Sequence, residues 1–143
     1  MDERTLAADL FNRAWELMEL PERDAAQDDE LLHCAHASRY HWIAAGTTVN
    51  AARGEWLCSR VYTVLGRPEP ALHHATRCLE LTRESETAED WDEPFAHEAL
   101  ARAHALVGDT AEARRHVELA RAAAIADPED REHLHEALAT VPV

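Results

Sequence analysis

The sequence predicts an all-α fold, and three features lead to this expectation. Apolar residues recur at three- and four-residue spacings along most of the chain, as on one face of a helix. Only four glycines and six prolines are present, which is little turn chemistry for a β-rich fold. Apolar residues make up 46% of the chain and charged residues 29%, a composition typical of globular domains. We therefore expect a single helical domain over residues 1–143, with about seven helices.

An irregular hairpin of two helices is predicted over residues 3–46. In the first helix, two aromatic residues, Phe11 and Trp15, stand beside a stripe of leucines. Asp24 and Gln27 have the spacing of a capping box, in which each side chain bonds the backbone N–H of the other residue. They mark the start of the second helix, which a glycine ends.

A second hairpin, over residues 48–82, contains the clearest turn signal of the chain. Gly66 suits the left-handed position that ends a helix, and Pro68 suits the first turn of the next helix, where no N–H is needed. Gly54 lies inside the first arm, where glycine costs about 1 kcal/mol relative to alanine. We interpret Gly54 as a point where another helix approaches closely.

A third hairpin is predicted over residues 91–126, followed by a capping helix over 128–140. Its first arm ends at Gly108, and Asp109 with Glu112 has capping-box spacing before the second arm, which extends to Ala126. In the last helix, apolar residues at helical spacing are expected to cover the end of the stack. These residues are Leu134, Ala137, Leu138 and Val141.

Small and large packing residues recur at matching offsets in the second and third hairpins. In the first copy they are Ser59, Tyr62, Leu65, Gly66, Ala71 and Cys78. In the second copy they are Leu100, Ala101, His104, Val107, Gly108, Ala113, Val117 and Ala120. Over roughly residues 50–126 this pattern resembles the tetratricopeptide repeat (TPR) family. The resemblance implies two degenerate repeats, antiparallel hairpins stacked as a right-handed array, and a groove that binds proteins or peptides.

The chain also departs from the TPR pattern. Glu55 stands where the family has a tryptophan, and Ala75 stands where it has an aromatic residue. Ala71 and Ala113 are 42 residues apart, whereas the family repeat has about 34 residues. The extra residues fall between the two hairpins, so we expect a long connection there and a TPR-like bundle rather than a regular superhelix.

Net charge and cysteine content narrow the class of partner. The formal net charge is −14, which disfavours binding to nucleic acid or to an anionic membrane. No apolar run approaches the roughly 20 residues of a membrane span, and the first residues lack a signal-peptide pattern. Three cysteines, an odd number in separate apolar contexts, indicate reduced core residues in a cytoplasmic protein. We expect no cofactor.

The groove that the resemblance implies would be lined by the first helix of each repeat. Carried over position by position, its residues are Arg53, Trp56 and Arg60, then Phe95, Glu98 and Arg102. Arginine pairs bidentately with carboxylates, so an acidic tail or a C-terminal carboxylate is the expected ligand. The expected function is a non-enzymatic interaction module for a protein or peptide, with a second copy of the chain as a further candidate partner. Alternatively, Arg53 and Arg60 pair with internal acids such as Asp92 or Glu98.

The histidine-rich second helix suggests a different function. His33 and His36 are three residues apart and are candidates to share one metal ion, but no third ligand follows at a recognisable spacing. We therefore interpret them as half-buried structural histidines. The alternative function is a small-ligand-binding or metal-binding protein, or an enzyme, with a pocket between the second and third helices. Its lining would be His33, His36, Tyr40, Asn50, Arg53 and Trp56.

No catalytic residue is predicted. Asp90 and Asp92 offer carboxylates for acid–base work, but they also stand where acids cap a helix, and we favour the capping role. Cys58 and Cys78 lie on opposite arms of one hairpin, and the sequence places no base beside either. His97 occupies a packing position of the TPR pattern, and we expect it in the core.

Overall fold

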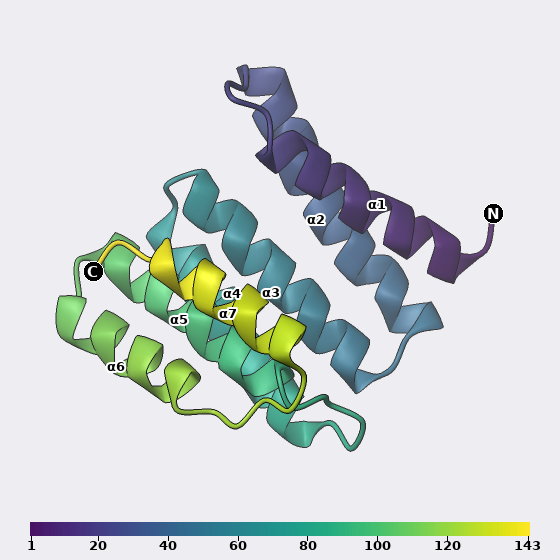
Figure 1. Cartoon of the computed structure of the whole chain (residues 1–143). Helices are drawn as coiled ribbons and strands as arrows, with labels where there is room; N and C mark the ends of the chain where they lie inside the picture. Colours follow the sequence, from purple (N-terminus) through teal and green to yellow (C-terminus); the bar gives the residue numbers. More distant parts are fainter.

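The computed structural model describes residues 1–143 and contains seven α-helices and no strand (Figure 1). This confirms the all-α fold and the number of helices. The helices are α1 (Glu3–Met18), α2 (Ala25–Ala45), α3 (Thr48–Val64), α4 (Pro68–Glu84), α5 (Asp92–Val107), α6 (Thr110–Arg121) and α7 (Pro128–Ala139).

The helices pack in the order in which they follow one another in the chain (Figure 1). The most extensive contacts are within three antiparallel pairs, α1 with α2, α3 with α4, and α5 with α6. Contacts of α2 with α3 and of α4 with α5 join these pairs. The first members α1, α3 and α5 also contact one another in sequence, and α7 packs on α5. Side chains of α1, α3, α5 and α7 can therefore meet on one side of the molecule.

The predicted helix boundaries are confirmed where glycine or a capping box defines them. The Gln27 amide N–H donates to Asp24 Oδ1 at 2.8 Å, and the Asp24 amide N–H donates to Gln27 Oε1 at 3.0 Å. Gly66 and Gly108 are the only residues with positive φ, at 74° and 97°. At these two positions the turn requires the left-handed backbone that glycine adopts without strain.

Two predicted boundaries in the C-terminal half are wrong. Helix α6 ends at Arg121 rather than at Ala126, because the following segment leaves the helical path and buries Ile125 against α7. Neither Asp90 nor Asp92 caps α5. The Asp90 carboxylate accepts a hydrogen bond from the Ala126 amide N–H at 3.0 Å, and Asp92 is already the first residue of the helix.

The core consists of three hydrophobic clusters arranged along the stack. One joins α1, α2 and α3, the second joins α5, α6 and α7, and the third joins α4 to α5. Leu134, Leu138 and Val141 are buried in the second cluster, as expected for a helix that covers the end of the stack. Trp56 packs against both the first and the third cluster, so it connects the two halves of the molecule.

Two expectations about exposure can be compared with the structure. The three cysteines are free and buried, as predicted for core residues. No helix of the structure combines the length and the apolar character that crossing a membrane requires.

Gly54 marks the closest approach of α3 to α2. A Cβ atom placed on Gly54 would lie 2.7 Å from Arg39 Cδ and 3.4 Å from the Cα atom of the same residue. The glycine therefore makes room for the Arg39 side chain, which confirms the interpretation from the sequence.

We expect Gly54→Val to lower the free energy of unfolding by about 2 kcal/mol, because the added side chain displaces Arg39 in a packed interface. Urea denaturation followed by circular dichroism measures the change. Ala111→Val adds a branched side chain at an exposed position of α6 and serves as the control. Equal effects of the two substitutions would contradict the close approach at Gly54.

Candidate functional site

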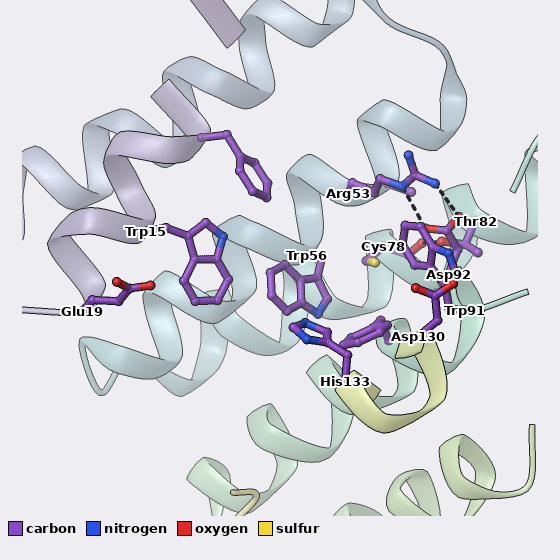
Figure 2. A pocket seen from close by; sticks show the side chains of 13 residues that line it. Trp15, Glu19, Arg53, Trp56, Cys78, Thr82, Trp91, Asp92, Asp130 and His133 are labelled. Carbon is purple, nitrogen blue, oxygen red and sulfur yellow. Dashed lines mark hydrogen bonds and ion pairs between the residues drawn. The ribbon is translucent and has the colours of Figure 1, made fainter. Parts of the chain in front are cut away.

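A cavity of about 550 Å³ lies between α1, α3, α5 and α7 (Figure 2). We call it the aromatic cavity. Its five aromatic residues are Phe11, Trp15, Trp56, Trp91 and Phe95. The other lining residues are Glu19, Ala52, Arg53, Cys78, Thr82, Asp92, Asp130 and His133. In Figure 2, Trp15 and Glu19 stand on one side of Trp56, and Asp130 and His133 stand on the other.

The rings form a continuous aromatic wall from α1 to α7. Trp15 and Trp56 stack with ring centroids 5.8 Å apart and an interplanar angle of 28°. The Phe95 ring meets Trp56 edge-on at 6.2 Å and Trp91 edge-on at the same distance. Phe95 also lies 5.6 Å from the His133 ring. Such rings offer a large apolar area at little cost in conformational entropy.

Arg53 is held by two groups at one end of the cavity. Its Nε and Nη2 atoms donate to Asp92 Oδ1 and Oδ2 at 3.0 and 2.9 Å. Its guanidinium carbon lies 4.5 Å from the centroid of the Trp91 ring. A bidentate ion pair and a cation–π contact together fix this side chain. Its charge is therefore neutralised within the protein.

Beneath the aromatic wall, Glu98 is completely buried and receives hydrogen bonds from three side chains. Trp56 Nε1 donates to it at 3.0 Å, Arg60 Nη1 donates at 3.1 Å, and Arg102 Nε donates as well. Arg102 also donates to two oxygens at the end of α7, including the Ala137 carbonyl at 2.7 Å. Glu98 thus orients Trp56 and links α3, α5 and α7.

The residues expected in the groove separate into three groups. Arg53, Trp56 and Phe95 come together in the aromatic cavity. Glu98, Arg60 and Arg102 form the ion network behind it, as the alternative of internal pairing proposed. The last two residues lie elsewhere. Asn50 accepts a hydrogen bond from the Thr47 amide N–H at the start of α3, and Tyr40 is 69% exposed on α2.

The sequence interpretation missed the contributions of α1, of α7 and of Trp91 to the cavity. Phe11 and Trp15, four residues apart beside the leucine stripe, already indicated a second apolar face on the first helix. Asp130 and His133 gave no comparable signal, because their position depends on the angle at which α7 crosses α5.

The alternative pocket between α2 and α3 is not assembled by its expected residues. Arg53 and Trp56 face the aromatic cavity instead, His33 is exposed, and Tyr40 lies outside. His36 belongs to a separate polar cluster, in which its Nε2 is hydrogen-bonded to the Tyr62 hydroxyl at 2.8 Å.

The centre of that polar cluster is the buried carboxylate of Glu55, the residue that departs from the TPR tryptophan. Arg39 Nε donates to it at 3.1 Å, and His74 donates from the other side. Burial alone would raise the pKa of Glu55, but the hydrogen bonds and charges of His74 and Arg39 outweigh it and hold the pKa below its ordinary value. The cluster therefore stabilises a buried charge.

One expectation about Cys58 needs correction. The sequence placed no base beside this thiol, yet His36 Nδ1 lies 3.9 Å from Cys58 Sγ. The thiol is fully buried, and burial raises the pKa of Cys58 to about 12. It is therefore protonated near neutral pH, and the nearby histidine does not make it a nucleophile.

We expect Glu98→Gln to lower the free energy of unfolding by about 3 kcal/mol, because two buried arginines lose their counter-charge. Chemical denaturation provides the measurement. Glu30→Gln removes an exposed partner of Arg13 and should change stability by less than about 1 kcal/mol. Similar losses in the two variants would show that Glu98 does not hold the network together.

The pH dependence of stability follows from His36. Burial, followed by the nearby charge of His74, lowers the pKa of His36 below its ordinary value of 6.5. The unfolded chain then binds a proton that the folded chain resists, so the free energy of unfolding decreases as the pH falls below about 6.5. Apart from His74, the groups that face His36 are the Tyr62 hydroxyl and the Cys58 thiol.

We expect His36→Gln to reduce this dependence by up to about 1.4 kcal/mol per pH unit. Denaturation curves between pH 7 and about pH 5 measure the slope, and His135→Gln, at an exposed position of α7, is the control. Identical slopes for the wild type and His36→Gln would rule out a neutral His36.

Comparisons with known proteins complete the description of this site. No protein-family model, curated protein or solved structure matches the chain. The chain is therefore described by its seven sequentially packed helices and by the chemistry of its aromatic cavity.

Proposed function

We propose that this chain is a non-enzymatic binding module whose aromatic cavity receives an apolar segment of a partner protein with basic residues at its ends. The observation that carries the proposal is the composition of the cavity. Five aromatic residues supply its walls, and its one arginine is neutralised by Asp92. Aromatic side chains at the centre of an interface supply much of the binding free energy.

The charges around the cavity favour a cationic partner over the acidic one expected from the arginines. Glu19 and Asp130 stand on opposite sides of the cavity, and neither forms an ion pair within the protein (Figure 2). The formal net charge of −14 acts in the same direction over longer distances. Lysine or arginine residues next to an apolar anchor would complement both features, since cations also bind aromatic faces favourably.

The groups within the cavity suit contact better than catalysis. Burial raises the pKa of Cys78 to about 12, so its thiol is a poor nucleophile near neutral pH. Both carboxylate oxygens of Asp92 already accept hydrogen bonds from Arg53. A general base needs a lone pair within reach of a substrate proton, and Asp92 does not offer one.

The resemblance to TPR proteins supports the same function. It implies a groove lined by the first helix of each hairpin. The cavity takes Phe11 and Trp15 from α1, Trp56 from α3, and Phe95 from α5, which are these first helices. The irregular N-terminal hairpin would then act as a further repeat-like unit that extends the groove.

The proposal is tested by selecting peptides from a random phage-displayed library on the immobilised, full-length protein. We expect the selected sequences to combine aromatic or aliphatic anchors with flanking lysine or arginine. Trp15→Ala should weaken binding of a selected peptide at least tenfold, about 1.4 kcal/mol, by isothermal titration calorimetry. Glu19→Lys combined with Asp130→Lys should weaken binding through charge repulsion, more strongly at low salt.

Tyr40→Ala is the matched control, because Tyr40 is an exposed aromatic residue outside the cavity. Its peptide affinity should equal that of the wild type. Selection of acidic peptides, or equal weakening by Tyr40→Ala and Trp15→Ala, would contradict the proposal. A concentration-dependent dimer that Trp15→Ala dissociates would instead assign the cavity to a second copy of the chain.

The volume of the cavity supports one other ligand class. At about 550 Å³, it falls within the roughly 300–1,000 Å³ typical of small-molecule sites. A planar, cationic small molecule would use the same aromatic wall and the same acidic residues. Binding of such compounds, lost in Trp15→Ala, together with no peptide selected by the library, would favour this second function.

A further inference from the structure

Three potential metal ligands meet between α5 and α6, away from the aromatic cavity. They are His104 of α5 and Glu112 and His116 of α6, and their ligand atoms all lie within 4.8 Å of one another. The His104 and His116 rings stack with centroids 5.5 Å apart and an interplanar angle of 7°. His116 Nε2 lies 3.8 Å from Glu112 Oε2. Two imidazoles and a carboxylate are thus already adjacent.

The local fold explains why these three side chains converge. The left-handed conformation of Gly108 ends α5, and Asp109 caps α6 by accepting a hydrogen bond from the Glu112 amide N–H at 3.2 Å. Glu112 and His116 are four residues apart and therefore lie on one face of α6. The two-residue turn brings that face against His104, in the last turn of α5. Little chain entropy is lost when the three ligands come together.

Hydrogen bonds orient His116 as a metal ligand requires. Its Nδ1 lies 2.9 Å from Nδ1 of His97, and Nη2 of Arg115 lies 3.4 Å from its Nε2. Because a guanidinium only donates, Nε2 carries a lone pair and Nδ1 carries the proton. His97 then accepts that proton's hydrogen bond and directs its own N–H toward Glu93, 3.8 Å away. Bound histidines commonly have such a second hydrogen bond that fixes the ring.

A cation already occupies the neighbourhood of these ligands. The Arg115 guanidinium donates to both carboxylate oxygens of Glu112, at 3.3 and 3.2 Å, as well as facing His116. The Arg115 side chain is 56% exposed, so it can move into solvent without leaving a cavity. The site therefore attracts positive charge and is accessible from solution.

We propose that His104, Glu112 and His116 bind a divalent transition-metal ion, with Zn²⁺ as the ion that fits them best. Neutral imidazoles and a carboxylate are common zinc ligands, and three protein ligands leave a fourth position for water. Ligand atoms about 2.0–2.1 Å from a tetrahedral zinc ion are about 3.4 Å apart. The donor atoms here need to close by about 1 Å or less, which rotations of partly exposed side chains permit.

His97 has a different role in this proposal. It is buried, at 6% exposure, as expected from its packing position, and it contacts His116 rather than the metal position. It is a positioning residue that selects the tautomer of His116. The expected pair of metal candidates in α2 offers no such arrangement, because His33 is exposed and His36 is bonded to Tyr62.

The test is titration of the untagged, metal-free, full-length protein with zinc chloride against a competing chromophoric chelator. We expect one equivalent of zinc to bind and the melting temperature to rise with zinc concentration. With cobalt chloride, the protein should show the intense visible absorption of a tetrahedral Co²⁺ site. His104→Asn and Glu112→Gln, both at partly exposed positions, should each weaken zinc binding at least tenfold.

Two further variants sharpen the test. Arg115→Ala should bind zinc several-fold more tightly, because it removes the competing cation, whereas loss of a merely structural residue would not raise affinity. His33→Asn, an exposed histidine on α2, should bind zinc as the wild type does. Absence of zinc binding at micromolar concentrations, or equal binding by His104→Asn, Glu112→Gln and wild type, overturns the proposal. Loss of binding in His33→Asn overturns it too, and assigns the ion to α2.

Discussion

The burial of Glu98 is the constraint on which the rest of this structure depends. A carboxylate removed from water is stable only when several donors surround it. Here the donors come from Trp56 and Arg60 of α3 and from Arg102 of α5, and Arg102 continues to the end of α7. One charge thus fixes the spacing of three helices and the orientation of the tryptophan at the centre of the cavity. The aromatic wall is held in place by electrostatics beneath it.

The same principle recurs at two other buried acids. Glu55 is bonded by Arg39 and His74, and Asp92 is bonded by Arg53. These acids lie on α3 and α5, so the interior of the stack consumes much of the arginine of an already acidic chain. Arginine suits this role better than lysine, because its planar fork satisfies both carboxylate oxygens at once. The outer surface is left correspondingly negative.

Much of the fold could be predicted from the sequence, because local signals define it. Gly66, Gly108 and the capping box at Asp24 fix helix ends without reference to distant residues. The candidate site was predicted only in part, since its members come from four helices whose crossing angles no local pattern encodes. Trp56 and Phe95 were found through the resemblance to repeats, whereas residues of α1 and α7 were not. Likewise, Glu112 and His116 share a visible helical spacing, but only the turn at Gly108 shows that His104 joins them.

The aromatic wall also gives this protein an optical property. Three of its four tryptophans, Trp15, Trp56 and Trp91, line one cavity, and the fourth, Trp42, lies apart beneath Arg4. The stacked rings of Trp15 and Trp56 are close enough for their excited states to couple. The ultraviolet emission of the molecule is therefore dominated by the state of this single region. The chain carries its own reporter of whether the cavity is filled, with no label attached.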